Sequence, residues 1–175
     1  DGPARRGVDR VAARQEDPVK GFRFSHEVEA AFGDLDAMGH VNNVVYLTWI
    51  ETARIAYWIH ITGQKTHAGL PKPGGASHEP GPGIMSGALI DMILARTEID
   101  YRSPVSYGEK LDVFVRTSLI KRSSLVFEYA VVSRTDERVV AEAKTVVVSY
   151  DYAKFKSKPV SEDLRSRILT TDPEA

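Results

Sequence analysis

Two aspartates and a glycine stand immediately before the longest predicted helix of the chain. Asp34, Asp36 and Gly39 occur in the segment FGDLDAMGHVNN, and residues 43–60 follow with a helical pattern. The first N–H groups of a helix have no partner within it and carry partial positive charge, so they can polarise a carbonyl group. A neighbouring carboxylate can deprotonate water or attack a carbonyl carbon. Together these are the groups that acyl-transfer hydrolysis requires.

The same aspartates also have a structural interpretation, because Asp is common in turns and helix caps. On spacing alone the structural interpretation is favoured. However, the block resembles the signature D-x-D-x-x-G-x-V-x-x-x-x-Y-x-x-x-x-E-x-x-R of the 4-hydroxybenzoyl-CoA thioesterase-like family. The matching residues are Asp34, Asp36, Gly39, Val41, Tyr46, Glu51 and Arg54. The similarity continues through ILARTEIDYRSPVSYGEKLDV as far as Asp151.

The resemblance implies an acyl-CoA thioesterase with Asp36 as the catalytic carboxylate. It also implies that backbone N–H groups from Gly39 to Val41 hold the thioester oxygen. The segment HVNN is similar to plant acyl-ACP thioesterases and bacterial long-chain acyl-CoA thioesterases, where an Asn and a His join the aspartate. His40 matches that His, but Met38 stands where the Asn is expected. For His40, hydrogen bonding to substrate or water and ordering of the turn both remain open.

Several helix residues are candidates for substrate binding. Asn42 and Asn43 are predicted first as helix caps, with substrate contact as the alternative. Glu51 and Arg54 lie three residues apart on one helix face, which favours an ion pair over a second active-site carboxylate. Burial of the helix would make that pairing obligatory. Tyr46 is predicted in the core, with the wall of an acyl tunnel as the alternative.

A basic hairpin turn is the second functional feature. Lys121, Arg122 and Ser124 match positions at which the family contacts the nucleotide end and the pantetheine channel of coenzyme A. Cations at a loop suit phosphate groups. An ordinary polar turn is the alternative interpretation, and Arg102 is a further candidate phosphate contact.

The elements that position these residues predict an α+β hotdog fold. The helix is apolar on nearly all sides and must therefore be surrounded by other structure. Asn42 or Asn43 can cap its start, and Gly63 lies just past its end. Strand patterns cover residues 22–31, 89–102, 110–119, 125–134 and 139–152, and a short helix is predicted over 161–169. A curved antiparallel sheet of about five strands can wrap around one buried helix. We expect the last four strands to form a meander, with the first strand placed among them.

The domain boundaries follow from the same pattern. Residues 1–20 are predicted as a flexible N-terminal arm, 21–160 as the hotdog domain, and 161–175 as a short C-terminal helix and tail. Within the domain, residues 63–87 form a long Gly/Pro-rich loop that suits a lid. Sheet edges left uncovered in one chain predict a homodimer or homotetramer with a continuous sheet.

Composition and missing motifs exclude other classes of protein. The net charge is −1, so no overall basic field attracts nucleic acid. The chain has no cysteine and no apolar run long enough for a membrane span or a signal-peptide core, and we expect a cytoplasmic protein. Its histidines lack the spacing of metal motifs, and no G-x-S-x-G elbow or dinucleotide fingerprint is present. No metal or cofactor is expected.

Acyl-CoA hydrolysis is therefore the predicted function, with acyl-ACP hydrolysis or a non-catalytic acyl-thioester-binding module as alternatives. A hotdog hydratase is disfavoured because the spacing of Asp36 and His40 matches those enzymes poorly. The pattern does not decide whether Asp36 is a base or a nucleophile. The HVNN variant favours aliphatic acyl groups.

Overall fold

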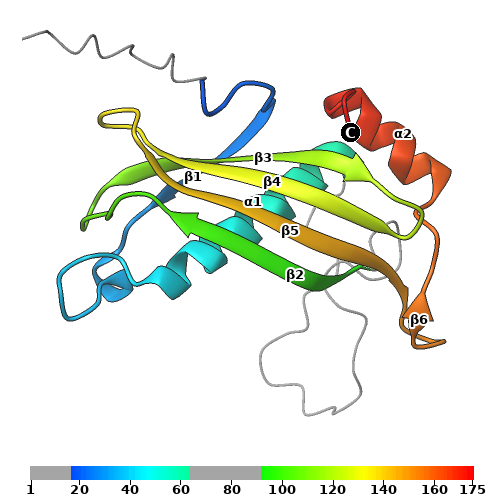
Figure 1. Cartoon of the computed structure of the whole chain (residues 1–175), viewed down its shortest axis with the longest axis horizontal. Helices are drawn as coiled ribbons and strands as arrows, with labels where there is room; N and C mark the ends of the chain where they lie inside the picture. Colours follow the sequence, from blue (N-terminus) through cyan, green and yellow to red (C-terminus); the bar gives the residue numbers. More distant parts are fainter. Residues whose placement is uncertain (1–16, 64–91) are drawn as a thin grey trace, which may run out of the picture.

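One curved antiparallel sheet wraps around a long helix, and a second helix covers one end of the arrangement (Figure 1). The computed structural model describes residues 17–63 and 92–175, so the predicted lid and most of the predicted arm lie outside the described residues. The helices are α1 (Asn43–Thr62), α2 (Glu162–Thr171) and the short 3-10 helix η1 (Phe32–Asp34). The strands are β1 (Phe24–Glu29), β2 (Met92–Tyr101), β3 (Lys110–Ile120), β4 (Ser124–Ser133), β5 (Val139–Asp151) and the short β6 (Lys156–Ser157). The predicted sheet wrapped around one long helix is confirmed.

The order of the strands differs from the prediction. Across the sheet it is β1-β3-β4-β5-β2, so only β3 to β5 form a meander and β1 and β2 lie at opposite edges. The predictions of a four-strand meander and of a first strand among the others were wrong. The reason is the crossing connection, residues 102–109, which passes the ends of β5 and β4 before β3 begins. Strands lie about 4.8 Å apart, so the three strand spacings from β2 to β3 amount to about 14 Å, well within the reach of such a connection.

Local interactions set both ends of α1 as predicted. The side chain of Asn42 accepts a hydrogen bond from the Val44 N–H at 3.0 Å. At the other end Gly63 has a φ of 67°, and its N–H donates to the Ile59 carbonyl at 2.9 Å. A left-handed residue that closes a helix is usually glycine, because glycine has no Cβ to clash there.

α1 is buried along one face rather than on nearly all sides. Ile50 and Ala53 are fully buried, whereas Val44 is 62% exposed and Leu47 and Ile55 are each 39% exposed. A single sheet layer covers only the helix face that it curves around, and the described residues leave the opposite face open. The predicted complete burial was therefore wrong for this part of the chain.

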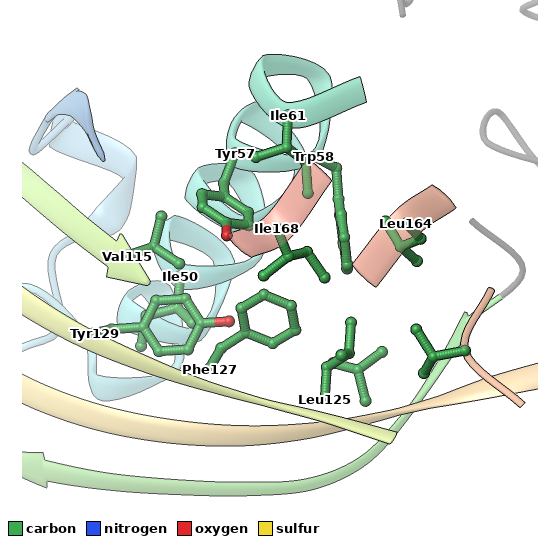
Figure 2. Packing of buried hydrophobic residues seen from close by; sticks show 12 residues of the cluster. Ile50, Tyr57, Trp58, Ile61, Val115, Leu125, Phe127, Tyr129, Leu164 and Ile168 are labelled. Carbon is green, nitrogen blue, oxygen red and sulfur yellow. The ribbon is translucent and has the colours of Figure 1, made fainter. Parts of the chain in front are cut away.

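An aromatic cluster fills the space between α1 and the sheet (Figure 2). The ring of Phe127 lies 5.3 Å from that of Trp58 and 5.9 Å from that of Tyr57, both close to perpendicular. Such edge-to-face pairs contribute about 0.5–1.5 kcal/mol each beyond burial. Leu164 and Ile168 of α2 pack into the same cluster, so the C-terminal helix shares the core of α1.

A buried carboxylate ties the end of α2 to α1 and β3. Asp172 is only 5% exposed, and its Oδ2 accepts hydrogen bonds from the Tyr57 hydroxyl at 2.6 Å and the Thr117 N–H at 2.8 Å. Burial, with the hydrogen bond to Asp172 second, raises the pKa of Tyr57 far above its usual range. The phenol therefore stays protonated and remains a donor.

We expect Tyr57→Phe to lower the free energy of unfolding by about 1–3 kcal/mol, because the buried Asp172 loses one of its donors. Denaturant unfolding measures the loss. Tyr152→Phe is the matched control, since the Tyr152 hydroxyl donates to the Met92 carbonyl at an exposed site. The control should change stability by less than about 0.5 kcal/mol. Equal losses in the two variants would contradict the anchoring role of Asp172.

Candidate active site

A cleft of about 410 Å³ lies at the N-terminal end of α1. Six predicted site residues line one side of it: Asp36, His40, Val41, Asn42, Asn43 and Tyr46. Tyr101, at the end of β2, and the first residues of the crossing connection, Arg102, Ser103 and Pro104, line the other. The loop before α1 and the crossing connection therefore form the two walls.

The two oxygens of Asp36 have different surroundings. Oδ1 accepts a hydrogen bond from the Met38 N–H at 2.8 Å and a longer one from the His40 N–H at 3.4 Å. Oδ2 accepts no hydrogen bond from any described residue. Asp36 thus orders its own turn through Oδ1, while its Oδ2 has no hydrogen bond from the described chain.

Asp34 has the structural role that the turn interpretation predicts. Its Oδ2 accepts a hydrogen bond from the Ala31 N–H at 2.8 Å, and its carbonyl accepts one from the Asn42 N–H at 2.8 Å. Both bonds hold the chain between β1 and α1. The structural interpretation therefore applies fully to Asp34 and only in part to Asp36.

The predicted oxyanion donors are largely engaged within the protein. The Gly39 N–H donates to the Asp36 carbonyl at 3.0 Å, and the Val41 N–H donates to the Val105 carbonyl at 2.9 Å. The tight turn engages the Gly39 N–H, with Gly39 at a φ of 79° and the Asp36 N–H donating to the His40 carbonyl at 2.8 Å. The crossing connection engages the Val41 N–H. The expectation that Gly39 and Val41 present free N–H groups to a substrate was wrong.

The first helical residue, Asn43, offers a donor of the kind that the sequence analysis expected at the start of this helix. The Asn43 N–H donates to no residue within 17–63 or 92–175, while the Asn43 carbonyl accepts a hydrogen bond from the Tyr101 hydroxyl at 2.9 Å. The signal was present in the sequence, since the residue after an N-cap has an N–H without a helical partner. Asn42 therefore caps the helix, and both Asn42 and Asn43 line the cleft.

Tyr46 lies in the core, as predicted, and also lines the cleft. Its ring lies 5.1 Å from that of Trp49 and 5.2 Å from that of Tyr101. Burial, followed by the charge of Glu109, raises the pKa of its phenol. His40 lies on the exposed loop, and its ring makes no interaction with the described part of the chain.

Glu51 lies outside the cleft. It pairs with Arg54 at 3.5 Å as predicted, but its side chain is 63% exposed and that of Arg54 only 10%. The assumption that both charges are buried was wrong, because Glu51 faces the open side of α1. Arg54 points inward, where its charge lowers the pKa of Tyr129 against the larger, opposing effect of burial.

The basic turn lies at the other end of the sheet. Lys121, Arg122 and Ser124 join β3 to β4 beside α2, whereas Asp36 lies near the end where β3 begins (Figure 1). The length of β3 separates these ends by about 33 Å, at 3.3 Å per residue. That separation exceeds the pantetheine arm that joins a thioester to its nucleotide. One chain therefore does not bring this turn and Asp36 to one substrate molecule.

Within the described ranges, no three His, Cys, Asp or Glu side chains gather closely enough to hold a metal ion. No helix in the same ranges has the length and apolar character needed to cross a membrane.

Comparisons with known proteins match the fold. A thioesterase from Thermus thermophilus, whose crystal structure contains coenzyme A and Zn, is 30% identical, with a TM-score of 0.67 over 89% of this chain and 99% of that one. A 1,4-dihydroxy-2-naphthoyl-CoA thioesterase from Synechocystis shares the fold at 18% identity, with a TM-score of 0.67 over 85% of this chain and 97% of that one.

The chain is also similar in sequence to the Bacillus subtilis (strain 168) protein YsmA. It is 28% identical over 109 residues, which are 62% of this chain and 60% of that protein's length. The profile of the thioesterase-like superfamily matches residues 30–168, a range that includes α1 and both walls of the cleft. The chain therefore belongs to the thioesterase-like superfamily.

Proposed function

We propose that this chain hydrolyses acyl-CoA thioesters to the free acid and coenzyme A in the cleft at the start of α1. The observation that carries the proposal is the unengaged Oδ2 of Asp36, which lies in a cleft beside a helix N-terminus. Coenzyme A as the thiol is supported by the coenzyme A-bound Thermus thioesterase, to which this chain is similar.

In the proposed reaction, Asp36 Oδ2 removes a proton from a water molecule that attacks the thioester carbon. Alternatively, Oδ2 attacks the carbon itself, and water then hydrolyses the mixed anhydride. The N–H groups of Met38 and His40 hold Oδ1, which orients the carboxylate without occupying Oδ2. Either route forms a C–O bond to the acyl carbon, breaks its C–S bond and releases coenzyme A after protonation of the sulfur.

The negative charge that develops on the carbonyl oxygen requires nearby donors. The Asn43 N–H is free of partners in the described chain, and the N-terminal end of α1 carries partial positive charge. We assign the oxyanion to this helix terminus rather than to Gly39 and Val41. The His40 side chain is a further donor to water or substrate from the same loop.

The walls of the cleft suit an apolar acyl group. Val41 and Tyr46 line one side, and Tyr101 and Pro104 line the other. The exposed side chains Val44 and Leu47 extend the apolar surface along α1. Aliphatic acyl groups remain the favoured class.

We expect Asp36→Asn to lower kcat about 10²- to 10⁴-fold, because an amide can neither accept the proton nor form the anhydride. Thiol release from a panel running from acetyl-CoA to palmitoyl-CoA, with benzoyl-CoA added, measures the effect. Asp34→Asn is the matched control, since an amide oxygen can still accept the Ala31 N–H bond. The control should retain kcat within about threefold.

Turnover in Asp36→Asn equal to that of the wild type would refute the assignment of Asp36. If the wild type releases no thiol from any acyl-CoA but hydrolyses acyl-ACP, the carrier-protein alternative replaces coenzyme A. If it binds acyl-CoA and hydrolyses neither substrate, the chain is a binding module.

The basic turn enters the proposal through a second copy of the chain. β2 pairs only with β5 among the described strands, so its outer edge can pair with another chain. We propose a homodimer or homotetramer in which Lys121 and Arg122 of one copy contact the phosphates of a substrate held beside Asp36 of another. This arrangement removes the conflict between the predicted phosphate contacts and the length of β3.

We expect Lys121→Ala combined with Arg122→Ala to raise KM for acyl-CoA about tenfold, since charged contacts to phosphate are lost. The matching acyl-pantetheine thioester lacks the nucleotide and is the substrate control. Its kcat/KM should not change. If KM rises for neither substrate, or rises equally for both, the result would count against phosphate recognition by this turn.

Mixed oligomers test whether the turn acts between copies. When Asp36→Asn subunits are mixed with subunits that carry the Lys121→Ala and Arg122→Ala changes, no chain has both an intact Asp36 and an intact basic turn. A complete site can then form only if Asp36 comes from one chain and the turn from another. We then expect the low KM of the wild type to reappear for a fraction of the sites. If the mixture retains only the raised KM, the turn does not act in trans.

A further inference from the structure

The guanidinium of Arg138 joins one wall of the cleft to the β4–β5 hairpin. Nη2 donates to the Pro104 carbonyl at 2.9 Å and to Oε2 of Glu109 at 3.0 Å, and Nε donates to the Ser103 hydroxyl at 3.2 Å. On its other side, Nη1 donates to both carboxylate oxygens of Asp136 at 2.8 and 2.9 Å. One side chain thus contacts the beginning and the end of the crossing connection, residues 102–109.

The crossing connection shapes the cleft directly. Ser103 and Pro104 line the cleft, and the next carbonyl, that of Val105, accepts the N–H of Val41 at 2.9 Å. Val41 follows His40 at the end of the loop that carries Asp36. Val105 is fully buried, so a shift of its backbone would disturb close packing as well as this hydrogen bond.

Backbone hydrogen bonds to Val140 and Ala30 hold the ends of the connection, whereas in its middle the Val105 carbonyl bonds to Val41 of the loop before α1. The Ser103 N–H donates to the Val140 carbonyl at 3.3 Å, and the Ala30 N–H donates to the Glu109 carbonyl at 3.0 Å. Between these points the chain has no regular structure, and Arg138 reaches the Pro104 carbonyl there. The guanidinium therefore supplies support where the sheet ladder supplies none.

The partner carboxylate of Arg138 is well placed to make this contact rigid. The Glu109 side chain is only 11% exposed, and its Oε1 lies 2.7 Å from Nη2 of Arg138. Burial opposes ionisation of Glu109, but hydrogen bonds from Arg138, Ser133 and the Ser106 N–H outweigh burial and keep its pKa below the usual value. Removing one partner of such a pair leaves an uncompensated charge, which is costly.

The same pair acts on the cleft through Tyr46. After burial, the charge of Glu109 is the next cause that raises the pKa of the Tyr46 phenol, and the charge of Arg138 opposes it. Both charges therefore lie close to a residue that lines the cleft.

We propose that Arg138, paired with Glu109, is a positioning residue for thioester hydrolysis: it holds the crossing connection so that the Val105 carbonyl keeps the Asp36 loop in its reactive position. This role rests on the proposed function. It requires the fork of a guanidinium, because the acceptors on Ser103, Pro104 and Asp136 lie in different directions. A lysine ammonium cannot reach them all.

Arg138→Gln and Arg134→Gln form a matched pair for the test. Arg134 lies in the same hairpin turn and pairs with Glu27 and Asp112 instead of with the crossing connection. We expect Arg138→Gln to lower kcat about 10- to 100-fold with little change in KM, because small displacements of reacting groups are costly. Arg134→Gln should retain kcat within about twofold.

Arg138→Lys keeps the positive charge without the fork and should remain close to Arg138→Gln in kcat. Wild-type kcat in Arg138→Lys, or equal kcat in Arg138→Gln and Arg134→Gln, would overturn the proposal. Thermal unfolding of all three variants reports whether any loss of kcat follows from general destabilisation.

Amide hydrogen exchange provides a readout that needs no substrate. We expect the Val41 N–H to exchange at least about fivefold faster in Arg138→Gln than in Arg134→Gln, because its acceptor carbonyl is no longer held. Equal exchange rates would overturn the positioning role. A wild type that hydrolyses no thioester would refute the proposed function instead, so the two failures are distinguishable.

Discussion

The burial of one face of α1 in the curve of the sheet is the constraint on which the other features depend. Twenty residues of helix extend about 30 Å, so α1 runs along much of the sheet. Perpendicular rings around Phe127 and the docking of α2 hold its C-terminal half. With that half held, the N-terminal turn of α1 is held at the opposite end of the sheet, where the cleft forms.

The cleft exists because the chain must cross the sheet at this same end. β2 lies at one edge and is separated from β3 by β5 and β4, so residues 102–109 pass directly in front of the start of α1. The Val105 carbonyl then takes the Val41 N–H, and the loop before α1 closes against the connection. One oxygen of Asp36 is used to order that loop, which leaves the other oxygen for chemistry. In the proposed function, the carboxylate that orders the turn is therefore also the reactive one.

The two ends of the sheet carry different chemistry. The end at Asp36 has a helix N-terminus, a carboxylate and a cleft lined by polar and apolar side chains, and the far end carries the Lys121–Arg122 turn beside α2. The open face of α1, with Val44, Leu47 and Glu51, lies between these ends and is not covered by described residues. In the proposed function, a single chain thus presents two partial recognition surfaces, together with an edge of β2 that pairs with no described strand.

The sequence by itself determined the features that depend on near neighbours. Asn42 and Gly63 predicted both ends of α1, and the position of Asp36 before that helix predicted a carboxylate beside free N–H groups, because caps and turns involve residues only a few positions apart. The strand order and the buried face of α1 became visible only in the tertiary structure. So did the hydrogen bond from the Val41 N–H to the Val105 carbonyl, which makes that N–H unavailable to a substrate. The tertiary structure also decided the distance of Lys121 from Asp36 and the contacts of Arg138. These depend on residues that are distant along the chain and meet only when the sheet forms, so no local pattern of residue types contains them.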